Sequence, residues 1–348
     1  MKLGMVTRNI LSRLLAGMLT LAVGSAAEAQ QRTRLEVYST LEIEHLNDFK
    51  KLFEAENRDL EIQWINDSTG VVTARLLAEQ GNQRGDAIWG LAVTSMLQLE
   101  KRGLLEPYAP KNLAEIKPSF RDPANPPSWV GLMAWVAAVC FNTVEATRLG
   151  LPTPSSWKDL LDPRFKGRLT MPHPASSGTG YFHVAAWIQM FGEAEAWAFM
   201  DRLHENIAVY EHSGTRPCRQ AAAGEFPVGI SAELAAASAR QKGAPVEGLL
   251  MNEGGGWDMD TAAILRGTRK PEAARRLIDF ATSRKANEFY ATFISQVAIP
   301  GVSGTIPFYP AGVADSMIKN DFTWSSDNRA RILAEWARRY DGKAAKKN

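Results

Sequence analysis

The chain has 348 residues, of which 45% are apolar and 22% are charged, and its formal net charge is +2. This is the composition of a globular protein, and the weak net charge argues against nucleic acid or an anionic membrane surface as a partner. The chain is long for a single hydrophobic core, so we expect two lobes.

The first 29 residues have the pattern of a secretory signal peptide. Three basic residues precede a short apolar stretch at 14–23, and residues 27–29 (AEA) form a small-x-small cleavage motif. The apolar stretch is too short to cross a bilayer. No cysteine lies near the cleavage point, so a lipid anchor is not expected. We expect a soluble periplasmic protein that begins at Gln30, in which basic and acidic residues balance.

The predicted elements of the first part of the chain alternate between strand and helix. Apolar and polar residues alternate over 34–40 and 60–65, which predicts two half-buried strands, and residues 86–89 predict a third. The segments between them have the apolar spacing of helices. Strands that alternate with helices favour a parallel sheet, in which ligands bind at the carboxyl ends of the strands.

A second lobe is predicted after residues 118–132, which are rich in proline and tryptophan. The continuous apolar run at 135–141 is typical of a buried strand, and we expect the chain to cross between lobes there. We expect one lobe to comprise residues 30–133 with about 258–300, and the other 134–257 with about 301–348. Further predicted elements are strands at 168–171, 206–210, 227–231, 257–259 and 261–265, and helices at 217–223, 271–283 and 327–340.

Two polar turns, residues 67–70 (DSTG) and 174–180 (PASSGTG), each lead into a predicted helix. A helix N-terminus has unpaired N–H groups and a partial positive charge, and glycines and hydroxyl groups let an anion bind there. The pair of turns therefore predicts two lobes that hold one small anion. The alternative is that both turns are ordinary helix caps, because Ser, Thr and Asp are preferred capping residues.

The chain has two cysteines, Cys140 and Cys218. In an oxidising compartment an even number of cysteines suggests a disulfide, and two buried free thiols are the alternative. Neither cysteine has a second cysteine or a histidine at metal-ligand spacing, so a metal site is not expected.

Segments spread over the chain carry a family resemblance: VYSTLE (37–42), DSTGVVTARLLAE (67–79), DAIWGLAVTS (86–95), NPPSWVG (125–131), AWVAAVCFNTVEA (134–146), MPHPASSGTG (171–180), NIAVYEHSG (206–214) and GWDMD (256–260). With them the sequence resembles the periplasmic solute-binding proteins of ABC importers. It falls in the group whose better-known members bind ferric iron, and it is most similar to 2-aminoethylphosphonate-binding proteins.

The resemblance implies an α/β fold of two lobes, the type II-like periplasmic binding protein architecture, with a ligand cleft between lobes joined by crossing strands. Hinge closure would trap the ligand. The implied partners are a membrane permease and an ATPase, and we expect a monomer with no cofactor.

An aminoalkylphosphonate carries phosphonate oxygens at one end and an ammonium group at the other. The phosphonate oxygens need neutral donors that converge from several turns. We expect these from Ser176, Ser177, Gly178, Thr179 and Gly180, then from Ser68, Thr69 and Gly70, and third from His212 and Ser213.

The ammonium end needs carboxylates or an aromatic face. Glu42 follows the first strand and is a candidate, although the helix dipole also favours an acid there. Asp258 is a second candidate, and Asp67 either faces the cleft or caps its own helix. Glu233 lies where related proteins carry aromatic and often basic residues, so it either contacts the ammonium group or shifts the preference to another ligand.

Other functions remain open on the sequence alone. Ferric iron needs hard anionic oxygens, usually paired tyrosines, and none of the seven tyrosines are adjacent. Phosphate or a sulfonate would suit the same turns, and a sensory binding protein linked to a chemoreceptor would look similar. No G-x-S-x-G or H-E-x-x-H motif is present, so an enzyme is not expected.

Overall fold

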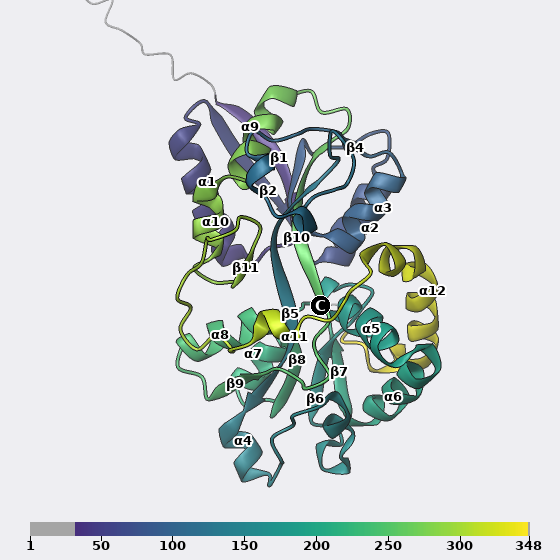
Figure 1. The fold of residues 1–348 in the computed structure, drawn as a ribbon. Helices are drawn as coiled ribbons and strands as arrows, with labels where there is room; N and C mark the ends of the chain where they lie inside the picture. The colour runs from purple at the N-terminus through teal and green to yellow at the C-terminus, as the bar shows by residue number, and fades with distance from the viewer. Residues whose placement is uncertain (1–31, 347–348) are drawn as a thin grey trace, which may run out of the picture.

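The computed structural model describes residues 32–346, so the predicted signal peptide and its cleavage site lie outside the described residues. The chain forms two α/β lobes, placed end to end and connected by the strands β5 (Val130–Asn142) and β10 (Trp257–Leu265) (Figure 1). The predicted two-lobe α/β fold with crossing strands is therefore confirmed.

Parallel strands form the centre of the first lobe, and helices lie on both sides of them (Figure 1). Along β1, Val37 belongs to the apolar cluster that includes Phe49 of α1, whereas Tyr38 belongs to the cluster that includes Leu76 of α2. This alternation is the one that the sequence pattern predicted. The elements of this lobe are β1 (Thr33–Ser39), α1 (Ile43–Glu56), β2 (Leu60–Asn66), α2 (Thr69–Ala78), β3 (Ala87–Ala92), α3 (Val93–Lys101), β4 (Leu105–Glu106), α9 (Pro271–Ala281), α10 (Arg284–Tyr290) and β11 (Gln296–Val297).

The crossing strand β5 belongs to both lobes. Its first part, residues 130–136, pairs antiparallel with β10, and residues 137–141 pair antiparallel with β8. Every residue of β5 is buried, as expected for a strand covered on both faces, and the strand begins before its predicted start at 135. The strand order β2-β1-β3-β10-β5-β8-β6-β7 therefore runs through both lobes.

The second lobe repeats the arrangement of helices around a mixed sheet (Figure 1). Strand β6 is parallel to both β7 and β8. The elements of this lobe are α4 (Thr143–Arg148), β6 (Leu169–Pro172), α5 (Gly178–Phe191), α6 (Glu193–Asn206), β7 (Ile207–Glu211), α7 (Arg216–Ala222), β8 (Val228–Ala232), α8 (Glu233–Gln241) and β9 (Val246–Leu249), followed near the end of the chain by α11 (Val313–Ser316) and α12 (Phe322–Tyr340).

A disulfide joins Cys140 of β5 to Cys218 of α7, with the two Cα atoms 5.3 Å apart. Both cysteines are buried in a small apolar cluster with Ala221 and Ala235, which attaches α7 and α8 to the crossing strand. The sequence left open whether the two cysteines form a disulfide or remain free thiols, and in the structure they form a disulfide.

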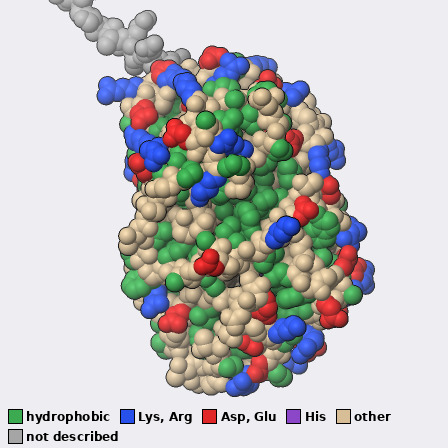
Figure 2. All heavy atoms as spheres, viewed as in Figure 1, with side chains coloured by type: hydrophobic (Ala, Val, Ile, Leu, Met, Phe, Trp, Pro, Cys, Tyr) green, Lys and Arg blue, Asp and Glu red, His purple; other side chains and the backbone are tan. Residues whose placement is uncertain are grey.

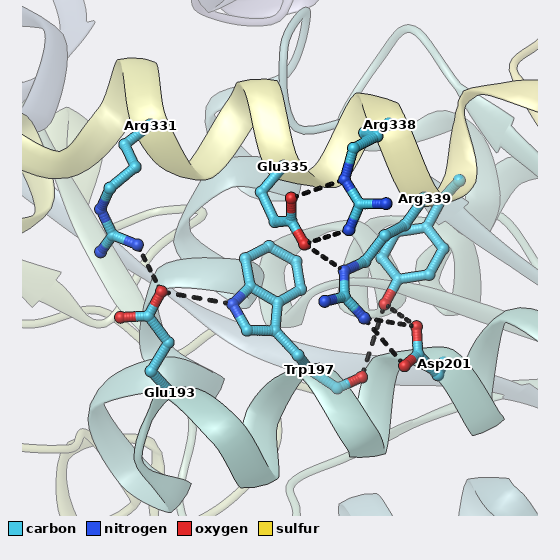
Figure 3. Close-up of polar contacts among 8 residues, drawn as sticks. Glu193, Trp197, Asp201, Arg331, Glu335, Arg338 and Arg339 are labelled. Carbon is cyan, nitrogen blue, oxygen red and sulfur yellow. Dashed lines mark hydrogen bonds and ion pairs between the residues drawn. The ribbon is translucent and has the colours of Figure 1, made fainter.

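The C-terminal helix α12 packs against α5 of the second lobe and α3 of the first. Figure 3 shows its polar contacts with α6, where Arg331 pairs with Glu193 and Arg339 pairs with Asp201. The helix begins at Phe322, before the predicted start at 327, because the Asp321 side chain caps its N-terminus.

Charged side chains of both signs are interspersed over the face seen in Figure 2. This distribution agrees with the weak net charge of the sequence. No helix among residues 32–346 combines the length and the apolar character that crossing a bilayer would need.

Candidate functional site

A cavity of about 520 Å³ lies between the lobes. Its walls come from both lobes, and the crossing strands contribute part of the lining. The lining residues are Thr40, Leu41, Glu42, Ile43, His45, Asn66, Asp67, Ser68, Thr69, Phe293 and Ile294 of the first lobe, Ser177, Gly178, Thr179, His212, Ser213, Gly214, Thr215, Arg219, Ala232 and Leu234 of the second, and Met133, Trp135 and Asp260 of the crossing strands.

The first polar turn leads into α2 as predicted. Ser68 is the residue before the helix, but its side chain makes no capping bond and instead donates to Asp67 Oδ1 at 3.3 Å. Asp67 Oδ1 also accepts from the Ser68 backbone N–H at 2.7 Å. These side chains and that of Thr69 line the cavity instead of capping α2, so the turn presents polar groups to the cavity.

The second polar turn leads into α5, and one of its residues is a true cap. Ser177 Oγ accepts from the Gly180 N–H at 3.3 Å, which leaves the hydroxyl proton of Ser177 available to a ligand. Thr179 also lines the cavity, and its hydroxyl makes no hydrogen bond to another described residue. The second turn therefore caps α5 and also lines the cavity, so the two alternatives do not exclude each other.

Ser176 positions this turn and does not line the cavity. Its Oγ donates to the His212 carbonyl oxygen at 3.1 Å, and its own carbonyl oxygen accepts from the Gly70 N–H across the lobes at 2.8 Å. Ser176 thus connects all three predicted turns through hydrogen bonds.

Gly70 and Gly180 also lie outside the lining, and both permit close backbone contact. A Cβ atom at position 70 would lie 2.0 Å from the Ala175 carbonyl oxygen, and one at position 180 would lie 2.5 Å from that of Pro172. The prediction placed both glycines at the ligand. In the structure, the missing side chain of Gly70 lets the first turn approach the second, and that of Gly180 lets α5 start close to the end of β6.

The third turn, residues 211–215, contributes His212 and Ser213 to the lining as predicted. The Nε2 atom of His212 is buried and has no hydrogen-bond partner among the described residues. A buried polar atom without a partner costs free energy, so this nitrogen is a candidate for a ligand contact.

Glu42 lies at the cavity rim and connects the two lobes. Its Oε1 accepts from Thr215 Oγ1 at 2.9 Å, and its Oε2 lies 3.8 Å from Arg219 Nη1. Nearby, Lys242 pairs with Glu44 at 3.0 Å, again across the lobes. The lobes are therefore in direct contact around the cavity.

Glu233 does not reach the cavity, contrary to the prediction. Its carboxylate is fully buried behind the lining, where it accepts from the Val136 N–H at 2.7 Å and from Tyr309 Oη at 2.6 Å. Burial raises the pKa of Glu233 to about 7, although these hydrogen bonds favour the ionised form.

Asp258 is also a structural residue and not a lining residue. Its carboxylate accepts from the Val93 N–H at 2.9 Å and from Thr94 Oγ1 at 2.7 Å, so it caps α3 from a neighbouring strand. Burial raises the pKa of Asp258 to about 6, against the effect of these bonds.

Six polar residues of the lining were not among the predicted site residues: Thr40, His45, Asn66, Thr215, Arg219 and Asp260. Asp260 is two residues beyond the predicted Asp258 in the same motif, and it is the carboxylate that faces the cavity. Arg219 lies one turn into α7, where its Nη1 donates to Thr215 Oγ1 at 2.6 Å. The available signals were the position of Thr215 and Arg219 in or just after the third turn, and the position of Asp260 beside Asp258 in the sequence.

An aromatic contact forms another part of the cavity wall. His45 stacks on Phe293 with ring centroids 3.8 Å apart, and burial lowers the pKa of His45. Within residues 32–346, no group of three or more His, Cys, Asp or Glu side chains is arranged to hold a metal ion.

Comparison with known proteins assigns the chain to a family. Residues 91–331 match the family model described as bacterial extracellular solute-binding protein. A Haemophilus influenzae protein, described as uncharacterized, is 33% identical over 291 residues, which are 83% of each chain. The probable ABC transporter periplasmic-binding protein y4fP of Sinorhizobium fredii is 24% identical over 249 residues, 69% of this chain and 67% of that protein.

Solved structures agree with this result. The periplasmic binding protein AfuA from Actinobacillus pleuropneumoniae, with fructose-6-phosphate bound, is 30% identical, with a TM-score of 0.82 over 89% of this chain and 99% of that one. The periplasmic binding protein P5PA is 27% identical, with a TM-score of 0.80 over 89% and 100% of the two chains. Iron-bound HitA from Pseudomonas aeruginosa, 18% identical with a TM-score of 0.75 over 87% and 99% of the chains, shares the fold. The chain belongs to the bacterial extracellular solute-binding proteins.

Proposed function

We propose that this protein is the periplasmic solute-binding component of an ABC importer and captures a small organic phosphonate or phosphate ester. One observation carries the proposal. The hydroxyl groups of Ser177 and Thr179 border one cavity and donate to no described residue, and Thr69 joins them from the opposite lobe. His212, whose buried Nε2 atom has no partner, lines the same cavity.

This arrangement suits a phosphoryl group. Neutral donors at helix N-termini bind oxyanions without the cost of burying a full positive charge, and α2 and α5 both begin at the cavity. The contacts of Glu42 with Thr215 and of Gly70 with Ser176 hold the lobes together around the enclosed volume. A ligand that contacts both lobes would favour this closed arrangement.

The size of the cavity favours a ligand with an organic part. Its volume of about 520 Å³ lies in the range of cavities that enclose small organic ligands, roughly 300–1,000 Å³. Inorganic phosphate would leave most of it to water. The sequence resemblance favours 2-aminoethylphosphonate as this ligand.

A sugar phosphate is the second candidate. AfuA, which is 30% identical over almost its whole length, was solved with fructose-6-phosphate bound. A sugar phosphate shares the phosphoryl group and would fill more of the cavity than 2-aminoethylphosphonate. Ferric iron is less well supported, because none of the seven tyrosines of the chain lines the cavity.

The proposed partners are a membrane permease and an ATPase. The name of the Sinorhizobium fredii relative, a probable ABC transporter periplasmic-binding protein, supports this assignment. A chemoreceptor is the alternative partner, and affinity capture with the purified permease would separate the two. We propose that the protein acts as a monomer.

A thermal-shift screen of the protein from residue 30 onward tests the ligand class. A ligand that binds only the native state raises the melting temperature by mass action. The screen compares 2-aminoethylphosphonate, fructose 6-phosphate, phosphate, taurine and ferric citrate. We expect a shift with one or both organic phosphoryl compounds; a shift with taurine or ferric citrate alone would contradict the proposal.

A further inference from the structure

Asp260 is a buried carboxyl group that the protein itself leaves without a partner. It lies in the crossing strand β10, its exposed fraction is 7%, and it lines the cavity. Its side chain makes no hydrogen bond to another residue within 32–346. Asp258, two residues earlier and equally enclosed, accepts hydrogen bonds from Val93 and Thr94.

The residues that lie next to Asp260 in the sheet provide no side-chain donor. Its antiparallel neighbours in the sheet are Ala92 and Met133. The nearby Tyr290 hydroxyl donates to the Ala281 carbonyl oxygen at 2.8 Å and accepts from Trp89 Nε1 at 2.9 Å. Both hydrogen-bonding functions of that hydroxyl are therefore already in use.

The electrostatic environment of Asp260 is also unfavourable for an ionised carboxylate. Burial raises its pKa well above the ordinary value, and the charge of Asp258 raises it further. The carboxyl group of Asp260 makes no hydrogen bond within the protein and borders the cavity, so a ligand there can supply the partner that the protein does not.

We propose that Asp260 receives a hydrogen-bond donor, an ammonium or hydroxyl group, from the organic part of the ligand and so determines which phosphoryl compound the cavity accepts. This inference rests on the proposed function, in which the hydroxyl groups of the turns hold the phosphoryl end. Asp260 comes from the crossing strand, whereas those hydroxyl groups come from turns of the two lobes, so the two sets can bind different parts of one ligand.

The two kinds of donor have different consequences for protons. An ammonium group pairs best with an ionised carboxylate, so an Asp260 that is protonated in the free protein releases a proton when such a ligand binds. A hydroxyl group can donate to a carboxyl group that stays protonated. Asp258 and Tyr290 interact electrostatically with Asp260, and both are engaged in hydrogen bonds within the protein. The other titratable or charged side chains that line the cavity with Asp260 are Glu42, His45, Asp67, His212 and Arg219.

Matched pairs of ligands test the proposal by titration calorimetry at pH 7. The first pair is 2-aminoethylphosphonate and ethylphosphonate, which lacks the ammonium group; the second is fructose 6-phosphate and inorganic phosphate. We expect the wild-type protein to bind 2-aminoethylphosphonate at least tenfold more tightly than ethylphosphonate, or fructose 6-phosphate at least tenfold more tightly than inorganic phosphate. We expect Asp260→Asn to reduce that preference at least tenfold, while its affinity for ethylphosphonate or inorganic phosphate stays unchanged.

Asp258→Asn is the matched control. It removes a carboxylate from the same strand and is expected to lower the melting temperature while it keeps the ligand preference. Asp260→Asn is expected to keep or raise the melting temperature of the free protein, because it removes a buried group that has no partner. Asp260→Ser gives a second measurement if the asparagine variant does not fold.

Several outcomes decide the matter. If the wild-type preference persists in both Asp260 variants, Asp260 does not bind the organic part and the proposal is wrong. An equal loss for all four compounds would place Asp260 at the phosphoryl end and would also overturn it. If the wild-type protein binds none of the four compounds, the proposed function itself fails. Proton release, measured in two buffers of different ionisation enthalpy, identifies the ammonium form of the proposal, and its absence identifies the hydroxyl form.

Discussion

The hinge, which comprises the crossing strands β5 and β10 and the residues that hydrogen-bond to them, contains the same kinds of polar residue as the cavity. The two regions differ in how these residues are hydrogen-bonded. At the hinge, the carboxylates of Glu233 and Asp258 are buried and fully hydrogen-bonded within the protein. In the cavity, the half-buried His212 has an Nε2 atom without a partner, and the buried Asp260 side chain makes no hydrogen bond to another residue within 32–346. Partnered polar groups hold a structure in place, whereas unpartnered ones beside a cavity point to a ligand.

The largest effect is expected from removing the hydroxyl groups of the second turn. A Ser177→Ala, Thr179→Ala double variant loses two hydrogen bonds to a charged group, each of about 1.5–3 kcal/mol, so the affinity for the best phosphoryl ligand should fall at least ~100-fold. Titration calorimetry measures this loss.

Ser156→Ala is the control for this variant. Ser156 also caps a helical turn, residues 157–161, but it lies outside the cavity. Both changes should cost about 1 kcal/mol of stability through the lost cap. If both variants bind the ligand as the wild type does, the second turn is only a structural cap.

Glu233 should make the free energy of unfolding depend on pH, without affecting ligand affinity. Burial raises the pKa of Glu233 to about 7 from an ordinary value of 4.5, so the folded state favours the protonated acid. The stability from this group is fully present below pH 4.5 and is lost as the pH rises through 7, by about 3 kcal/mol in total.

Glu233→Gln should remove most of this pH dependence. Denaturant unfolding at pH 5 and pH 8 should show that the wild type loses about 2–3 kcal/mol more stability than the variant over this interval. Asp258, whose pKa is also raised, contributes equally to the pH dependence of stability in both proteins, so its contribution cancels in the comparison. Ligand affinity should stay within about twofold; a large loss would show that the hinge and the cavity are not separate.

Closing of the cavity should depend on the absence of a side chain at position 70. In Gly70→Ala the new methyl group would meet the Ala175 carbonyl oxygen, and overpacking of this kind costs about 1–3 kcal/mol. Since the contact joins the two lobes, affinity should fall about 10- to 100-fold while the free protein keeps its melting temperature. Val71→Ala, at the neighbouring exposed position, should change neither. A Gly70→Ala variant with normal affinity would show that this contact is not needed in the bound state.

Most strands and both polar turns at the cavity could be predicted from the sequence, because alternation and capping patterns are local. The role of Glu233 could not, since its burial depends on Tyr309, which is distant in the sequence. The difference between Asp258 and Asp260 depends on where α3 begins and on a register shift just after Asp260. Such facts of tertiary packing decide which of two similar carboxylates faces a ligand.

The smallest effect is expected at the rim, where Lys242 and Glu44 pair across the lobes at 3.0 Å. Both side chains are largely exposed, and exposed ion pairs contribute about 0–1 kcal/mol. Lys242→Ala should therefore weaken ligand binding by no more than about fivefold at low ionic strength, and high salt should abolish the difference because it screens exposed charges. Lys51→Ala removes a similar exposed pair, with Asp48, that lies within α1 and should not affect affinity. Equal effects of the two variants would mean that the rim pair does not stabilise the closed lobes, and that the contacts of Gly70 and Glu42 are responsible for closure.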